Sequence, residues 1–301
     1  MAKKSGGGGC LVVVLVVGLL AFGYYKWQHG SSSAPPGGAD TGGGTGRYVA
    51  LGDSYTSAPR TGRQAGTPAG CERSDDNYPH LVSAKLKPAE FADVSCSGAA
   101  TGDLTAAQKT SNGTNPPQLN AVTAKTTLVT LGIGGNDVGF MSLASSCATS
   151  QRAASPCKDR LTAGGHDQLA ERIDATAPKL GAVLERIHSK APDAKVVVVG
   201  YPAVLPDGDG CWPTLPFGAG DIAYFRDSLG KLNKMLEDTA DAHRAGYADT
   251  ATPGKGHDAC AASGERWVEG VLPASPAAPL HPNARGEQGM ADAVLAVLKL
   301  P

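Results

Sequence analysis

The segment YVALGDSYTSA, residues 48–58, constrains this chain more than any other part of the sequence. Its first four residues are typical of a buried strand, and that strand stops at Gly52, two positions before Ser54. This arrangement lifts a hydroxyl to the rim of a sheet, where it can act as a nucleophile. The tripeptide Gly-Asp-Ser is weak evidence by itself, because turns favour all three residue types.

Strand-like and helix-like segments alternate along the rest of the chain. Continuous β-rich runs at 127–131 and 195–200 are typical of strands that are covered on both faces, and further strands are predicted at 48–51, 91–95 and 247–249. Strands that are separated by helices predict a parallel sheet in a three-layer α/β/α sandwich.

Apolar residues that recur every three or four positions predict three long helices. The first covers 169–187, where Pro178 is expected to kink or split it. The second is expected to begin at Asp221 as its N-cap and to end at Gly246. The last helix follows Asn283, which is its expected N-cap.

Three candidate site residues each follow a predicted strand, namely Ser54, Gly98 and Asn136. We expect them to lie together, because the carboxyl ends of parallel strands share one edge of the sheet. A glycine backbone and a carboxamide are suitable hydrogen-bond donors for a developing oxyanion. The alternative is that Gly98 only turns the chain and that Asn136 caps a helix or forms an Asx-turn.

A serine hydroxyl needs a base, because it is a weak nucleophile at neutral pH. Of the seven histidines, His281 is the strongest candidate, since it stands in a loop just before the last helix. His257 is a weaker candidate and is expected to order its own loop. Asp53, next to Ser54, is expected to order the turn.

The cysteine count is typical of a disulfide framework in an oxidising compartment. Cys10 lies in the N-terminal segment, and the six others allow fifteen pairings. We expect sequential pairing, which gives Cys71–Cys96, Cys147–Cys157 and Cys211–Cys260. A zinc site is the alternative, but the sequence contains no Cys-x-x-Cys motif.

Residues 1–29 have the pattern of an export signal, with two lysines before an apolar run at 11–25. A retained signal anchor is favoured over a cleaved signal peptide, because no small-residue cleavage site follows the run. Either form would send the rest of the chain outside the cytoplasm, membrane-anchored or secreted. Residues 30–46 are predicted to be a flexible linker, and 47–301 the folded domain. A net charge of −1 without basic runs argues against a nucleic-acid partner.

Four motifs occur in the order that is typical of the SGNH/GDSL hydrolases: GDSY at 52–55, Gly98 in SCSGA, GGND at 134–137 and HPN at 281–283. From residue 47 onward the chain resembles the secreted actinobacterial lipase/esterase branch of that family. The segments TLVTLGIGGND and VVVVGYP and the cysteine framework belong to the same resemblance. It implies a flavodoxin-like fold of about five parallel strands, and ester hydrolysis through an acyl-enzyme with no metal or other cofactor.

The resemblance also implies the roles of individual residues. Ser54 would be the nucleophile and His281 the base, while Ser54, Gly98 and Asn136 would form the oxyanion hole. Most of the family has an aspartate three residues before the histidine, where this chain has Ala278.

The resemblance to the secreted lipases of this branch implies that a backbone carbonyl orients the histidine instead, so that the pair is a Ser–His dyad. We hypothesise that the carbonyl of Ala278 or Pro279 accepts a hydrogen bond from the imidazole Nδ1–H. A neutral acceptor stabilises imidazolium less than a carboxylate does, so the pKa of His281 should be lower than in a full triad.

The resemblance also points to carboxylic esters of fatty acids, short to long, as substrates. Candidate linings of an acyl groove are the loops 141–144 and 205–217, the latter with Trp212, Leu215 and Phe217. The alternative for the second loop is packing around the disulfide-tethered Cys211. Two other functions stay open at this point: a carbohydrate O-acetyl esterase, and a catalytically silent domain that only binds. The sequence makes no prediction of oligomeric state.

Overall fold

The computed structural model describes residues 46–299, except for the side chains of 144 and 145. The predicted signal segment 1–29 and the linker residues 30–45 lie outside the described residues. The main sheet has five parallel strands in the order β2-β1-β5-β6-β7. The strands are β1 (Arg47–Gly52), β2 (Glu90–Asp93), β5 (Thr126–Gly132), β6 (Lys195–Val199) and β7 (Gly246–Ala248). All five predicted strands are confirmed to within one or two residues.

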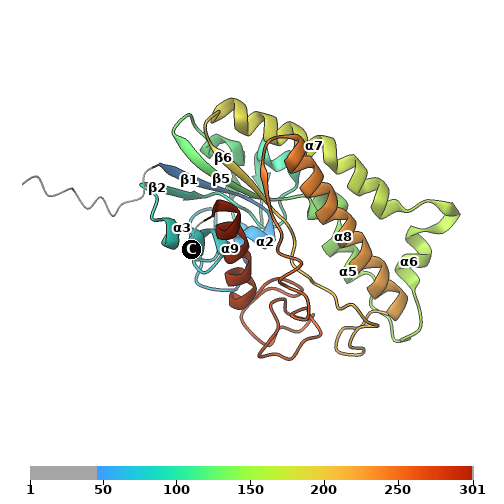
Figure 1. The fold of residues 1–301 in the computed structure, drawn as a ribbon. Helices are drawn as coiled ribbons and strands as arrows, with labels where there is room; N and C mark the ends of the chain where they lie inside the picture. The colour runs from blue at the N-terminus through green and yellow to red at the C-terminus, as the bar shows by residue number, and fades with distance from the viewer. Residues whose placement is uncertain (1–45, 300–301) are drawn as a thin grey trace, which may run out of the picture. The chain divides into compact units, whose positions relative to one another are not determined.

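Helices cover both faces of this sheet (Figure 1). On one face lie α3 (Tyr78–Leu86) and α9 (Ala284–Leu298), which pack against each other; on the other lie α7 (Gln168–Lys190) and α8 (Ala219–Ala242). The central strands are mostly apolar because they are covered on both faces: Val197 and Val198 of β6 point to opposite faces, and both are fully buried. The predicted α/β/α sandwich is therefore confirmed.

Short elements connect these layers. The short helices are α2 (Ser54–Ser57), α4 (Gly135–Val138), α5 (Phe140–Ser145) and α6 (Pro156–Leu161). Turns of 3-10 helix lie at Ala69–Cys71, Thr101–Leu104, Gln118–Ala121 and Ala163–Gly165, and a small antiparallel pair joins β3 (Gln108–Lys109) to β4 (Thr114–Asn115).

The predicted ends of α8 are wrong at both sides. The N-cap is Gly218, and Asp221 lies fully buried in the first turn. Its carboxylate instead accepts hydrogen bonds from the backbone N–H groups of Cys157 (3.3 Å) and Lys158 (2.7 Å), at the start of α6. The helix ends at Ala242, because the chain turns there and Gly246 already belongs to β7.

The other two helices agree better with the sequence pattern. The expected split at Pro178 is nevertheless wrong, because α7 is one helix with this proline inside it, although a proline in a helix removes one backbone hydrogen bond. Asn283 is confirmed as the N-cap of α9, because its side chain accepts from the N–H groups of Arg285 (3.0 Å) and Gly286 (3.2 Å).

Three disulfides cross-link the loops and short helices that connect the strands and long helices. They pair Cys71 with Cys96, Cys147 with Cys157 and Cys211 with Cys260, as the sequence predicted. The last of them ties the loop after β6 to the loop that leads toward His281.

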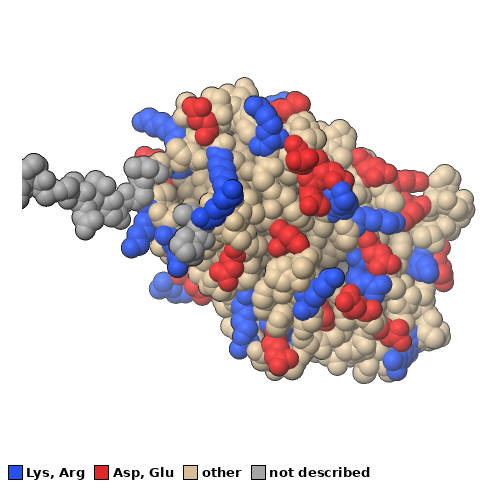
Figure 2. Space-filling model, viewed as in Figure 1, with Lys and Arg blue, Asp and Glu red and all other residues tan. Residues whose placement is uncertain are grey.

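The surface carries no large region of one charge on the face shown in Figure 2, where lysine and arginine mix with aspartate and glutamate. Within residues 46–299 no helix is both long enough and apolar enough to cross a bilayer.

Candidate active site

The turn between β1 and α2 presents Ser54 at the carboxyl edge of the sheet. Gly52 is required there, since a Cβ at this position would lie 2.5 Å from the carbonyl oxygen of Gly132 on the neighbouring strand. The side chain of Gln118 holds both backbone groups of Gly52, the N–H at 2.8 Å and the carbonyl at 2.9 Å. Asp53 is the N-cap of α2 and accepts from the N–H of Tyr55 at 2.9 Å, so it orders the turn as expected.

The structure brings His281 to Ser54 across 227 positions of sequence, with Nε2 of the imidazole 2.8 Å from the serine Oγ. The other ring nitrogen, Nδ1, is 2.8 Å from the carbonyl oxygen of Pro279. A carbonyl can only accept, so Nδ1 carries the proton in this arrangement and Nε2 has a lone pair for the serine hydroxyl. The geometry therefore holds the tautomer that a general base needs.

No carboxylate within the described residues bonds to the imidazole. The buried carboxylate of Glu269 is occupied elsewhere, by the side chain of Asn283 (2.7 Å) and the N–H of Ala274 (2.8 Å). Burial lowers the pKa of His281 most, the bond to Pro279 raises it, and the charge of Arg60 lowers it. The net direction is downward, so the imidazole is neutral, and able to accept a proton, over a wider pH range.

The predicted oxyanion residues lie on two neighbouring segments. Gly98 has a φ of +80°, a conformation that favours glycine, and its segment is joined to the end of β1 by the N–H of Cys96, 3.0 Å from the carbonyl of Gly52. Asn136 lies within α4 and not at its cap, and its Nδ2 donates to the carbonyl of Ala99 at 2.9 Å. An amide nitrogen carries two hydrogens, so one remains for a ligand.

A buried network of hydrogen bonds links the turn that carries Ser54 to the turn that carries Asn136. The hydroxyl of Tyr201, just after β6, donates to Asp53 at 2.6 Å and accepts from the N–H of Gly135 at 2.7 Å. It therefore joins the turn that carries Ser54 to the turn that carries Asn136. Burial raises the pKa of Asp53 to about 7, against the opposing effect of its bonds to Tyr201 and Tyr55.

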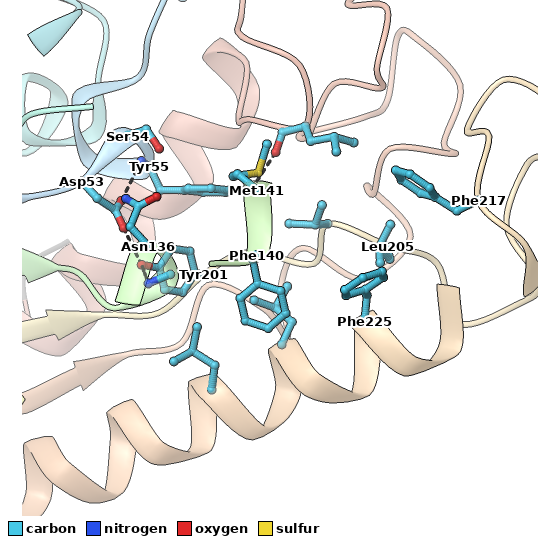
Figure 3. A pocket seen from close by; sticks show the side chains of 15 residues that line it. Asp53, Ser54, Tyr55, Asn136, Phe140, Met141, Tyr201, Leu205, Phe217 and Phe225 are labelled. Atoms are coloured by element: carbon cyan, nitrogen blue, oxygen red, sulfur yellow. Dashed lines mark hydrogen bonds between the residues drawn. The ribbon is translucent and has the colours of Figure 1, made fainter. Parts of the chain in front are cut away.

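A cavity beside Ser54 is lined mostly by apolar side chains (Figure 3). Ser54 and Asn136 lie at one end of it and Phe217 at the other, with α8 forming the floor. The apolar lining consists of Phe140, Met141, Val204, Leu205, Phe217, Phe225, Leu229, Leu232 and Leu280. Such a lining suits a hydrocarbon chain.

The predicted lining was partly right. Met141, Leu205 and Phe217 contribute to the cavity, but Trp212 and Leu215 do not. Leu215 is buried in the core, while Trp212 is partly exposed and donates its indole N–H to the carbonyl of Thr149 at 3.3 Å. Only the two ends of this loop, Leu205 and Phe217, therefore line the cavity. Its middle, around Cys211, packs against other parts of the protein, which was the alternative interpretation.

His257 does not belong to the candidate site. Its Nδ1 lies 2.6 Å from the carbonyl of Glu265, and its ring stacks on Trp267 with an interplanar angle of 10°. It orders its own loop, as the sequence suggested. Among residues 46–299, no group of three or more histidine, cysteine, aspartate or glutamate side chains is arranged to hold a metal ion.

Comparison with known proteins identifies the family. The model of the GDSL-like lipase/acylhydrolase family matches residues 50–288, and the chain belongs to this family. It is a carboxylic ester hydrolase of the lipase/esterase type.

Several proteins that are similar to this chain come from Streptomyces. Lipase 2 of Streptomyces coelicolor is 39% identical over 262 residues, which cover 84% of this chain and 86% of the relative. The crystal structure of phospholipase A1 from Streptomyces albidoflavus is similar with a TM-score of 0.70 and 31% identity, and covers 84% of this chain and 98% of its own. The extracellular lipase of Streptomyces rimosus has a TM-score of 0.69 and 30% identity over the same shares.

Sequence reasoning assigned no role to two residues that the structure places at the centre of the site. Tyr55 lies inside the GDSY motif, directly after Ser54, and Tyr201 lies inside VVVVGYP. Both line the cavity. The position of each at the carboxyl end of a buried strand was the available signal, because sites in parallel sheets lie at that edge.

Proposed function

We propose that this protein hydrolyses fatty acyl esters outside the cytoplasm through a Ser54–His281 dyad and an acyl-enzyme. The observation that carries the proposal is the contact of Ser54 Oγ with His281 Nε2 at 2.8 Å, while Nδ1 of the same ring is held by the Pro279 carbonyl at 2.8 Å. A nucleophile within hydrogen-bond reach of a base that is itself oriented by a third group is the arrangement that serine catalysis requires.

In the first half of the reaction the Ser54 hydroxyl attacks the carbonyl carbon of the ester, and its proton passes to Nε2 of His281. The tetrahedral intermediate then collapses, the C–O bond to the alcohol breaks, and Nε2 returns the proton to the leaving oxygen. In the second half His281 takes a proton from water, whose oxygen attacks the acyl-serine. Collapse of this second intermediate releases the carboxylic acid and restores the Ser54 hydroxyl.

The oxyanion of both intermediates is proposed to lie against the N–H groups of Ser54 and Gly98 and the amide of Asn136. Ser54 is the first residue of α2, and a backbone N–H at this position has no partner within the helix. Gly98 has no side chain, and only Gln108 Nε2, at 3.7 Å, lies within 4 Å of the position that a Cβ would take, so a ligand can approach its backbone closely. A single donor of this kind is typically worth about 10²–10³ in rate.

The cavity favours a fatty acyl chain over the alternative substrate, an acetyl group on a carbohydrate. An acetyl site needs room for a single methyl group and polar walls for the sugar, whereas nine apolar side chains extend here from Ser54 to Phe217. Burial of hydrocarbon contributes about 0.8 kcal/mol per CH₂ group, so each added carbon that the cavity accepts should strengthen binding.

The extracytoplasmic location is supported by the three disulfides, which persist in oxidising compartments. A similar lipase, that of Streptomyces rimosus, is described as extracellular. The basic-then-apolar pattern of residues 1–29 would supply the export signal, either retained as a membrane anchor or cleaved.

The test is to produce the protein through an oxidising compartment and to measure hydrolysis of p-nitrophenyl esters from acetyl to palmitoyl. We expect kcat/KM to rise from acetyl to the longer chains. Activity that is confined to the acetyl ester would contradict the proposal and favour the carbohydrate esterase. Reduction of the disulfides should lower the melting temperature, since three cross-links constrain the unfolded chain.

A further inference from the structure

The loop that carries His281 has an unfavourable backbone conformation at the residue before the histidine. Leu280 has a φ of +58°, in the left-handed region that non-glycine residues rarely adopt. This torsion sets the angle between two consecutive peptide groups, the one that bears the Pro279 carbonyl and the one that leads into His281. The direction of the Pro279 carbonyl, which holds Nδ1 of His281, therefore depends on the conformation of Leu280.

Two hydrogen bonds hold Leu280 in place. Its N–H donates to the carbonyl of Gly270 at 3.3 Å, and its carbonyl accepts from the hydroxyl of Tyr55 at 2.7 Å. The second bond is the shorter, and it comes from the residue directly after the candidate nucleophile, Ser54. Burial raises the pKa of Tyr55, so the phenol keeps its proton and remains a donor.

The ring of Tyr55 also contacts the imidazole. The two ring centroids are 4.8 Å apart with an interplanar angle of 30°, and on its other side Tyr55 meets the ring of Tyr201 edge-on, with centroids 5.0 Å apart. The side chain of Tyr55 is 8% exposed. One tyrosine thus contacts both the ring of His281 and the backbone that orients this ring.

We propose that Tyr55 is a positioning residue of the dyad: its hydroxyl holds Leu280 in the left-handed conformation and so directs the Pro279 carbonyl at Nδ1 of His281. The inference rests on the proposed roles of Ser54 and His281. Because Ser54 and Tyr55 are consecutive residues of α2, the same turn of helix positions both the nucleophile and the loop of its base. The hydroxyl thus acts on the orientation of His281 indirectly, through the backbone of Leu280 and Pro279.

The test is Tyr55→Phe, which keeps the ring contacts with His281 and Tyr201 and removes only the hydroxyl. We expect kcat to fall by about 10- to 100-fold with KM changed by less than about twofold, because misalignment of a general base affects the chemical step. The acid limb of the kcat/KM profile should move to lower pH. The reason is that the Pro279 bond raises the pKa of His281, so weakening this bond lowers it.

Tyr48→Phe is the matched control. Tyr48 is also buried, and its hydroxyl also has a partner, Thr130 Oγ1 at 2.9 Å, but it lies on β1 away from the His281 loop. This variant should lose stability without a change in the pH profile. A Tyr55→Phe enzyme with kcat within twofold of the parent and an unmoved acid limb would overturn the proposal.

A second variant covers the case in which Tyr55→Phe does not fold. Leu280→Val acts on the same backbone directly, because a β-branched residue adopts the left-handed conformation less readily than leucine, and it leaves the Tyr55 hydroxyl in place. It should also shift the acid limb to lower pH, and an unmoved limb would overturn the proposal. The titration of His281 followed by NMR without substrate gives the same answer independently of ester hydrolysis. If the parent protein hydrolysed no ester, the proposed function would fail while the effect of Tyr55 on His281 would still be measured.

Discussion

Two sides of Ser54 can be compared directly. On one side are the polar groups, His281 at 2.8 Å and the amide of Asn136, which are tied to the backbone by hydrogen bonds and allow little movement. On the other side the cavity is lined by apolar side chains from α5, α8 and the loop after β6. These side chains can make only van der Waals contacts with a ligand. The polar side should determine the rate for every ester, and the apolar side should determine which ester is preferred.

The largest effect should come from removing the nucleophile. Ser54→Ala is expected to lower kcat by roughly 10⁴-fold or more on every chain length, because the remaining groups cannot form the acyl-enzyme. Ser57→Ala is the matched control, since Ser57 is a buried serine on the same helix whose Oγ has no hydrogen-bond partner. The measurement is hydrolysis of p-nitrophenyl butyrate and palmitate. A residual activity of Ser54→Ala near that of Ser57→Ala would disprove the role of Ser54.

A smaller and selective effect should come from the apolar side. Leu205 lies beside Phe225 and Phe217, at the end of the cavity away from Ser54. Leu205→Trp narrows that end, so kcat/KM for the palmitoyl ester should fall by about tenfold while that for the acetyl ester changes little. Leu272→Trp makes the same change of size at an exposed position outside the cavity and should be neutral. An equal loss on both esters would show that the apolar side also affects the chemical step, and the contrast between the two sides would not hold.

The ionisation of Asp53, on the polar side, should also make the stability of the protein depend on pH. Burial raises the pKa of Asp53 to about 7, above the unfolded value of about 3.9. Asp53 therefore keeps its proton to a higher pH in the folded state than in the unfolded state. The contribution of Asp53 to the unfolding free energy is therefore largest below pH 4 and is lost, by at most about a few kcal/mol, as the pH rises toward 7. Asp53→Asn cannot ionise and should flatten this part of the curve. Thermal melts between pH 4 and 8 test it, with the exposed Asp292→Asn as control; an unchanged slope would contradict the assignment.

The smallest effect should come from Arg60, whose charge lowers the pKa of His281 from an exposed position. Arg60→Gln should raise the pKa of His281 and move the acid limb of kcat/KM to higher pH, opposite to Tyr55→Phe. Salt should abolish the difference, because exposed charges are screened within about 10 Å at 0.1 M. The control is Arg63→Gln, since Arg63 is paired with Asp75 at 2.8 Å. A shift of equal size in both variants would indicate a general charge effect.

Much of the fold could be predicted because its signals are local. Continuous apolar runs such as 195–200 mark strands that are buried on both faces, and they were found to within two residues. Helix ends were harder: Asp221 has the chemistry of an N-cap, but its carboxylate binds the first N–H groups of α6, 63 and 64 positions earlier in the chain. Such a choice between local and distant partners depends on packing that a sequence pattern does not contain.

The sequence by itself determined which residues can carry the chemistry. Ser54, Gly98 and Asn136 follow three strands, and parallel strands must bring their carboxyl ends to one edge, so these residues were expected together before any coordinates. It also revealed the missing acid, since Ala278 stands at the position of the usual aspartate.

Only the tertiary structure decided how His281 is held and where the acyl chain would lie. The choice of the Pro279 carbonyl over that of Ala278, and the bond from Tyr55 to Leu280, depend on backbone torsions and on contacts between residues 225 positions apart. The cavity likewise combines side chains from α5, α8 and two loops. The physical reason is that residue type fixes what a group can donate or accept, whereas direction and distance are fixed only when distant segments pack.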